Sequence, residues 1–180
     1  MSVTSRLIEL LRERSVRRGS FTLASGKHSD LYVDARQTTL HAEGAALVGE
    51  AIRARLQPGV VGVGGLTMGA DPIATTVSVG SWGTDQVVHA FLIRKTAKGH
   101  GTGRRVEGMA NLPQGSRVCV VEDTTTTGGS LIQAVEAARE AGLDVVQTIT
   151  VVDRSEGARE ALAAVGLELE ALVTRADLVD

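Results

Sequence analysis

Residues that could bind a ligand or take part in a reaction are concentrated in the segment 117–130, where an apolar run is followed by two acids, four threonines and two glycines. The β-branched run predicts a strand over Arg117–Glu122, and a helix is expected over Ser130–Ala141. Glycines let a backbone approach an anion closely, while hydroxyls and the free N–H groups of a helix start can donate to it. The segment therefore predicts a phosphate-binding turn built from Thr124, Thr125, Thr126, Thr127, Gly128, Gly129 and Ser130.

The two acids before this turn indicate a second part of the ligand. Carboxylates accept hydrogen bonds only, so Glu122 and Asp123 suit the vicinal hydroxyls of a sugar, and a diol beside a phosphate indicates a ribose 5-phosphate. Neighbours on a strand point to opposite faces, so both acids can reach one diol only if the pleat breaks at Glu122. The alternative is a turn that merely caps the helix, which needs one hydroxyl and leaves the paired acids unexplained.

Other well-known sites fit the sequence less well. A P-loop needs a Gly-Lys-Ser/Thr run, and the segment 117–130 has no lysine. The nearest approach to G-x-G-x-x-G begins at Gly62 and has Thr67 in the last place. No G-x-S-x-G occurs, and four scattered histidines with one cysteine lack the spacing of a zinc site, so we expect no metal held by protein ligands alone.

A second functional candidate is a polar stretch over 96–109 that directly follows an expected strand ending at Ile93. Loops of this length in a compact domain are usually functional or disordered. Up to four cations lie within the seven residues 94–100 at its start, which suits neutralisation of an anionic leaving group, although a solvated charge cluster is the alternative. These cations are Arg94, Lys95, Lys98 and His100.

The elements that must position these residues alternate along most of the chain. The pattern predicts helices over 4–16, 39–56, 68–79, 130–141 and 156–165, with Gly19 ending the first and Thr39 capping the second. Strands are expected over 21–24, 31–34, 60–63, 87–93, 117–122, 145–152 and 167–173. Nearly continuous β-branched runs are typical of parallel strands covered on both faces, so we expect an α/β fold with a doubly wound sheet.

Composition limits the class of protein. A chain of 180 residues predicts one domain, and a net charge of −2 gives no basic field for nucleic acid or a membrane surface. No apolar run reaches the length of a membrane span. The single Cys119 lies in an apolar run, where we expect a buried, inert thiol in a reducing compartment, and hence a cytoplasmic protein.

Taken together, these motifs resemble a known family. The segment from Val120 to Ser130 resembles the signature by which type I phosphoribosyltransferases bind 5-phosphoribosyl 1-pyrophosphate (PRPP). Phe21–Asp30, Arg94–Gly101 and Val152–Arg154 resemble the hood, flexible-loop and base-binding motifs of the orotate phosphoribosyltransferase branch, so the likeness spans roughly 20–155. It implies a mainly parallel, twisted sheet flanked by helices, a small N-terminal hood over approximately 1–38, and a flexible catalytic loop over approximately 95–109.

The resemblance also implies roles for residues. Glu122 and Asp123 would hold the ribose hydroxyls, and the turn 124–130 the 5-phosphate, while Gly64–Asp71 resembles the pyrophosphate loop. The cations Arg94, Lys95, Lys98 and His100 would meet PRPP, with Lys98, His100 and Asp123 in catalytic roles. Orotate would contact Thr126, Arg154 and Lys27. Mg²⁺ would be held mainly by PRPP and water, and the loop would close over the neighbouring subunit of a homodimer that makes orotidine 5-monophosphate and pyrophosphate in pyrimidine (UMP) biosynthesis.

Two positions depart from the pattern of many relatives. Ala24 and Met68 stand where those relatives carry lysine, so contacts to the substrates are expected to be fewer or rerouted, for example through Lys27. A phosphoribosyltransferase for another nucleobase and a PRPP-binding regulator with the same fold are the two alternatives.

Overall fold

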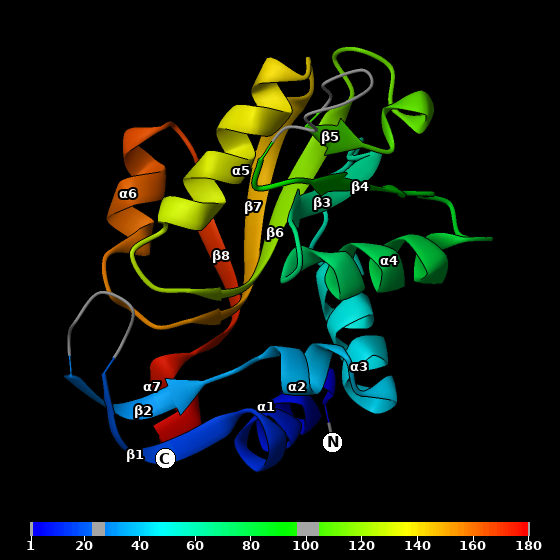
Figure 1. The fold of residues 1–180 in the computed structure, drawn as a ribbon. Helices are drawn as coiled ribbons and strands as arrows, with labels where there is room; N and C mark the ends of the chain where they lie inside the picture. The colour runs from blue at the N-terminus through cyan, green and yellow to red at the C-terminus, as the bar shows by residue number, and fades with distance from the viewer. Residues whose placement is uncertain (1, 23–27, 97–104, 180) are drawn as a thin grey trace.

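The computed structural model describes residues 2–22, 28–96 and 105–179, with side chains described outside 22–30. Its main feature is a six-stranded sheet in the order β5-β4-β3-β6-β7-β8 (Figure 1). Every neighbouring pair is parallel except β4 with β5. The strands are β3 (Gly62–Leu66), β4 (His89–Ile93), β5 (Val106–Glu107), β6 (Arg117–Thr125), β7 (Asp144–Asp153) and β8 (Leu169–Thr174). The expected α/β class with a mainly parallel sheet is confirmed.

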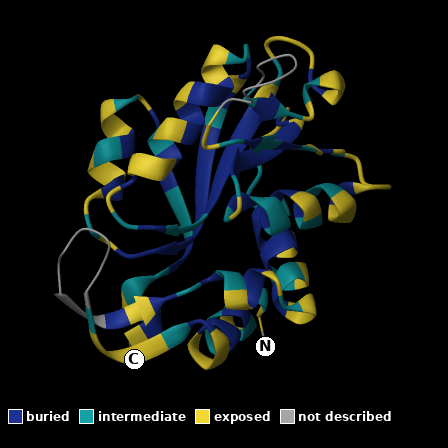
Figure 2. Cartoon of the chain, viewed as in Figure 1, coloured by how far each residue is buried: buried dark blue, intermediate teal, exposed yellow. Residues whose placement is uncertain are grey.

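Helices cover both faces of this sheet, as the apolar strands predict. One face packs against α3 (Ala42–Arg53) and α4 (Ala70–Ser81), the other against α5 (Gly129–Glu140) and α6 (Ala158–Ala164) (Figure 1). Side chains along β6 alternate between the two faces of the sheet. Cys119 and Val121 belong to the apolar core on the first face, and Val118 and Val120 to the core on the second. The strands are correspondingly buried through the centre of the molecule (Figure 2).

The N-terminal part lies beyond the carboxyl ends of the parallel strands (Figure 1). It consists of α1 (Val3–Arg14), an antiparallel hairpin of β1 (Val16–Thr22) and β2 (His28–Val33), and the short α2 (Arg36–Thr39). Helix α1 packs on α3 and on the last helix, α7 (Arg175–Val179). Arg12 Nε donates to the carbonyl of Asp177 at 3.0 Å, and Arg18 Nη2 donates to the carbonyl of Val179 at 2.7 Å. Helix α1 and the hairpin are therefore both held to a segment more than 150 residues away in the chain.

Several expected boundaries are wrong, each for a local reason. The first helix is capped by Ser2, whose side chain accepts from the Ser5 amide, and it ends at Arg14. Gly19 therefore lies inside β1, next to an irregularity in the pairing with β2. Thr39 ends α2 instead of capping the next helix, since α3 begins only at Ala42. A buried hydrogen-bonded corner around Thr38 replaces the continuous helix, with Thr38 Oγ1 2.7 Å from Ser15 Oγ.

Other differences are smaller and concern the sheet edge. Strand β6 continues past the expected end at Glu122 to Thr125. The polar stretch 96–109 contains the short antiparallel strand β5, and a turn of 3-10 helix follows over Met109–Asn111. No helix in the part of the chain that the structure describes has both the length and the apolar character of a membrane span.

Candidate functional site

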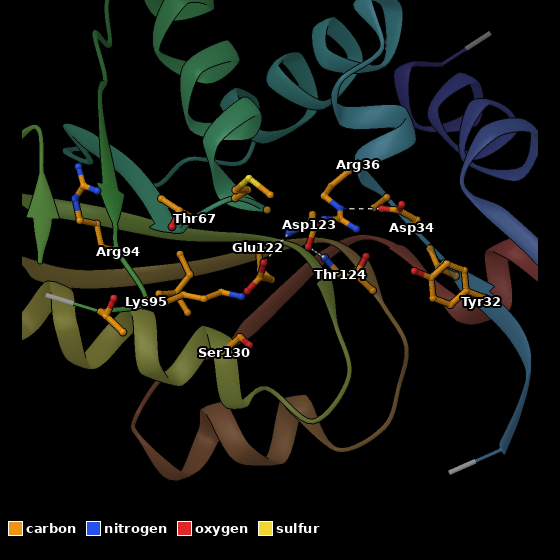
Figure 3. Close-up of a pocket in the computed structure, with 16 residues that line it drawn as sticks. Tyr32, Asp34, Arg36, Thr67, Arg94, Lys95, Glu122, Asp123, Thr124 and Ser130 are labelled. Atoms are coloured by element: carbon orange, nitrogen blue, oxygen red, sulfur yellow. Dashed lines mark hydrogen bonds and ion pairs between the residues drawn. The ribbon is translucent and has the colours of Figure 1, made fainter. Parts of the chain in front are cut away.

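A cavity of about 710 Å³ opens at the carboxyl edge of the sheet (Figure 3). Four separate parts of the chain line it: the residues leading into α2, the turn from β3 to α4, the end of β4, and the junction of β6 with α5. This is where a parallel α/β sheet places its ligands, because the turns that follow the strands meet there. The lining residues are Tyr32–Arg36, Leu66–Gly69, Arg94–Thr96, Glu122, Asp123, Thr124 and Ser130.

The two acids of β6 converge in this cavity, which we call the larger pocket. A methyl group built on Gly69 would lie 2.8 Å from a carboxylate oxygen of Glu122 and 2.8 Å from one of Asp123. The expected break in the pleat is absent, because the pairing with β7 runs from Glu122 to Thr125 without a shift. Instead, each carboxylate turns back toward the chain: Glu122 Oε1 accepts from the Asp123 amide at 3.3 Å, and Asp123 Oδ1 from the Thr124 amide at 2.7 Å.

The environment of Glu122 disfavours its charged form. Burial first, and then the neighbouring charge of Asp123, raise the pKa of Glu122 well above its ordinary value. Lys95 acts in the opposite direction, and its side chain extends toward Glu122 (Figure 3). A cation or hydroxyl donors arriving beside the pair would therefore stabilise the ionised acid.

A smaller pocket of about 210 Å³ adjoins the larger one and is lined by one continuous turn, Glu122 and Thr124–Leu131. Gly128 is the N-cap of α5 with φ of +85°, and no side chain caps this helix. The amides of the first turn are consequently available to an anion, with the positive end of the helix dipole behind them. Thr124 Oγ1 is buried and has no hydrogen-bond partner among the described residues, so it too is available to a ligand.

The predicted cations are only partly brought together. Lys95 is exposed and lines the larger pocket, whereas Arg94 donates from Nε to Glu107 Oε1 at 2.9 Å and points away from Glu122 (Figure 3). A backbone bond from the Arg94 amide to the Arg105 carbonyl holds the two ends of the polar stretch together. Lys98 and His100 lie outside the described residues.

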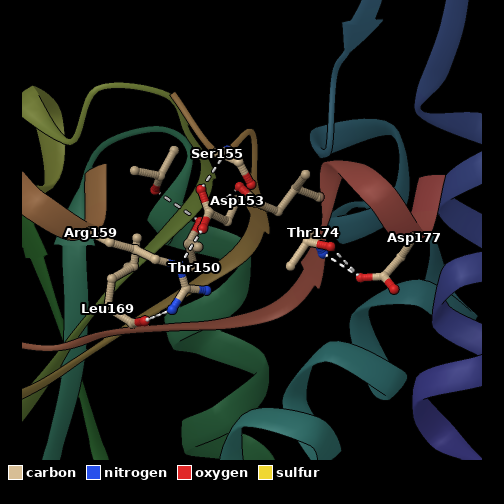
Figure 4. Close-up of polar contacts among 9 residues, drawn as sticks. Thr150, Asp153, Ser155, Arg159, Leu169, Thr174 and Asp177 are labelled. Carbon is tan, nitrogen blue, oxygen red and sulfur yellow. Dashed lines mark hydrogen bonds and ion pairs between the residues drawn. The ribbon is translucent and has the colours of Figure 1, made fainter. Parts of the chain in front are cut away.

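Arg154 lies at the carboxyl end of β7 with its side chain only 3% exposed. Its Nη2 is 3.2 Å from Glu156 Oε1, and it is not among the residues that line the larger pocket. The turn around it is held by the fully buried Asp153, which accepts from the Ser155 amide at 2.8 Å and from Arg159 Nε at 3.0 Å (Figure 4).

Of the other two predicted contacts of the base, only one falls on a described residue. Thr126 lines the smaller pocket together with the rest of its turn. Lys27 lies outside the described residues.

One side of the larger pocket was not predicted from the sequence; it is formed by Tyr32, Asp34 and Arg36. Tyr32 is the only tyrosine of the chain; it lines the pocket, and its ring centroid lies 5.5 Å from that of Phe21. Rarity of aromatic residues was the one signal available. Asp34 and Arg36 looked like an ordinary strand end, because nothing local shows that β2 faces the acids of β6. No group of three or more acidic, histidine or cysteine side chains suited to a metal ion occurs in the described ranges.

Comparison with known proteins gives a consistent result. Residues 37–170 match the family described as the phosphoribosyl transferase domain. An orotate phosphoribosyltransferase of Corynebacterium glutamicum is 49% identical over 173 residues, covering 96% of this chain and 91% of that protein. The crystal structure of the Mycobacterium tuberculosis H37Rv orotate phosphoribosyltransferase in complex with Fe(III) dicitrate superposes with a TM-score of 0.85 at 43% identity, covering 99% of this chain and 100% of that one. The structure of the same enzyme in complex with PRPP gives 0.80 at 40% identity, covering 98% of this chain and 99% of that one.

Proposed function

The chain belongs to the phosphoribosyltransferase family, among the orotate phosphoribosyltransferases, and on that premise we propose that it transfers the 5-phosphoribosyl group of PRPP to orotate. The products are orotidine 5-monophosphate and pyrophosphate, a step of pyrimidine biosynthesis. One observation carries this proposal: two converging carboxylates share a site with an uncapped, hydroxyl-rich helix start. That combination suits a ribose diol and its 5-phosphate at once.

PRPP would occupy both pockets. Its 5-phosphate fits the smaller pocket, where the amides of Gly129 and Ser130 and the free hydroxyl of Thr124 can donate. Its ribose hydroxyls would donate to Glu122 and Asp123 across the shared boundary, since Glu122 lines both pockets. The diphosphate would then lie in the larger pocket, beside the turn Leu66–Gly69, with Lys95 and the proposed loop cations Lys98 and His100 around it.

The base would lie toward the N-terminal side of the larger pocket. The exposed face of Tyr32 offers it a stacking surface there. Arg154 is proposed to take the orotate carboxylate, which requires that the carboxylate replace Glu156 on its guanidinium. Thr126 and Lys27 complete the proposed contacts of the base. The division into a hood over approximately 1–38 and a catalytic loop over approximately 95–109 belongs to the same proposal.

Catalysis in this proposal is electrostatic. Orotate N1 replaces diphosphate at ribose C1 through an oxocarbenium-like transition state, and the charge that develops on diphosphate is met by cations. Mg²⁺ is the proposed cofactor and would neutralise part of that charge when bound. The residues present fit an oxygen-preferring ion, because the carboxylates of Glu122 and Asp123 open into the same pocket as the diphosphate. PRPP and water would supply most of its ligands.

A homodimer is the proposed working unit. A shallow groove of about 490 Å³ runs between α2 and α4, and its walls include Leu40 and Val79, each 71% exposed. Trp82, at the end of α4, is 83% exposed. Exposed large apolar side chains are typical of protein contacts, so the face that carries this groove is the proposed interface. We also propose a cytoplasmic location, which suits a chain whose single Cys119 is buried.

The decisive experiment measures orotate consumption by absorbance with PRPP and Mg²⁺ present. We expect turnover with orotate and none with uracil, hypoxanthine or adenine at the same concentration. Turnover with another base in place of orotate would assign the chain to a different substrate. Binding of PRPP without turnover of any base would indicate a regulator.

A further inference from the structure

The larger pocket has few described cations for the charge that a diphosphate carries. Met68, which carries no charge, lies in its lining at the turn proposed to hold the diphosphate. Of the three described cations in the lining, Arg94 points away from Glu122, whereas Lys95 and Arg36 lie near the acids of β6 (Figure 3). Three acids, Asp34, Glu122 and Asp123, line the same space.

Arg36 is held at the pocket by a carboxylate of its own. Its Nε donates to Asp34 Oδ1 at 2.9 Å, and Gln37 Nε2 donates to the other oxygen of Asp34 at 3.2 Å. Burial raises the pKa of Asp34, but the hydrogen bonds from Arg36 and Gln37 outweigh it, and the net pKa is lower than usual. Asp34 is therefore ionised at neutral pH, and the pair holds the guanidinium in one orientation.

The outer edge of this guanidinium is available. Nη1 and Nη2 of Arg36 donate to no other described residue, and the group lies between Asp34 and Asp123 in Figure 3. Asp34 and then Asp123 are among the causes that raise the pKa of Arg36, so the guanidinium stays protonated. Two parallel N–H groups on a fixed planar cation match two oxygens of a phosphate.

We propose that Arg36 binds the diphosphate of PRPP, with Asp34 as its positioning residue. The inference rests on the proposed function, because it assumes PRPP in the larger pocket. The diphosphate is favoured over the orotate carboxylate because Arg154 is already the residue assigned to that carboxylate, whereas few described cations line the larger pocket.

The test is PRPP binding by calorimetry in the absence of orotate, followed by steady-state kinetics. Hydrogen bonds to charged groups contribute enough that Arg36→Ala should weaken PRPP binding by about ten- to a hundredfold. Arg36→Lys should restore part of the loss, and Asp34→Asn should give a smaller loss by freeing the guanidinium. Arg6→Ala is the matched control, since it removes a comparable pair, Arg6 Nε to Glu43 Oε1 at 2.6 Å, outside the pocket.

Two outcomes would overturn the assignment. One is a PRPP affinity of Arg36→Ala equal to that of wild type. The other is a rise in KM for orotate with PRPP binding unchanged, which would move Arg36 to the carboxylate. Thermal melting of each variant separates loss of fold from loss of contact. If wild-type protein binds PRPP but does not consume orotate, the proposed reaction fails while the calorimetric comparison still decides the role of Arg36.

Discussion

The two pockets at the sheet edge differ in how they are built. The smaller pocket comes from one continuous turn, whose glycine conformation and free helix start need no other part of the chain. The larger pocket is assembled from four segments, and its walls carry opposite charges at close range. A local site of the first kind is fixed by its own sequence, whereas the second depends on the fold to bring distant residues together. Binding of the phosphate and chemistry at C1 should therefore respond differently to mutation.

The largest effect is expected where the larger pocket meets the departing charge. In the proposed mechanism Lys98 meets the departing diphosphate, so Lys98→Ala should lower kcat by roughly a hundredfold, as loss of one donor to a charge that develops in the transition state does. PRPP binding should change little, since the contact strengthens only as diphosphate departs. Single-turnover kinetics beside calorimetry would separate the two quantities. Unchanged turnover would remove Lys98 from the mechanism.

The next prediction tests the close approach at Gly69. Gly69→Ala would place a methyl group 2.8 Å from the carboxylates of both Glu122 and Asp123, so the acids must move apart. We expect kcat/KM to fall by about ten- to a hundredfold, as misplacement of groups at a reacting centre does. Gly80→Ala, at the other end of α4, is the control, because its new methyl group meets only the flexible side chain of Arg53. Equal activity of the two variants would contradict a shared ribose site.

The smaller pocket can be tested in the same way at Gly128. A side chain there is strained at φ of +85° and would lie 3.1 Å from Leu162, so Gly128→Ala should distort the turn. PRPP and ribose 5-phosphate should both bind about tenfold more weakly, with kcat nearly unchanged. Gly115→Ala introduces similar strain at φ of +80° but in open space, away from both pockets. A loss of kcat alone in Gly128→Ala would show that the turn acts in chemistry rather than in binding.

The smallest effect concerns stability and pH. Because the folded-state pKa of Glu122 is raised, the folded protein favours the protonated acid. This stability is fully present below the ordinary glutamate pKa and is lost as pH rises through the raised value. Each unit of pKa displacement corresponds to about 1.4 kcal/mol, so Tm of wild type should fall by a few degrees relative to Glu122→Gln across that window. A difference in Tm between the two proteins that stays the same at every pH would contradict the raised pKa of Glu122.

The same contrast explains how far the sequence could be interpreted. The turn 122–130 and the order of the longer strands and helices were predictable, since glycine, hydroxyl and β-branched patterns act locally, whereas the short α2, β5 and α7 were not predicted. The wall formed by Tyr32, Asp34 and Arg36 was not, because its place depends on how the N-terminal hairpin packs on the sheet edge. The continuation of β6 past Glu122 was also missed, since its pairing with β7 outweighs the poor strand preference of two acids.

The bonds that join Arg12 to Asp177 and Arg18 to Val179 bear on the order of assembly. Contacts across so long a stretch of chain cost loop-closure entropy before they add stability, so we expect them to form slowly. The wall that Tyr32 and Arg36 contribute should thus become ordered in the last stage of folding. Until then, the acids of β6 would remain open to water on that side.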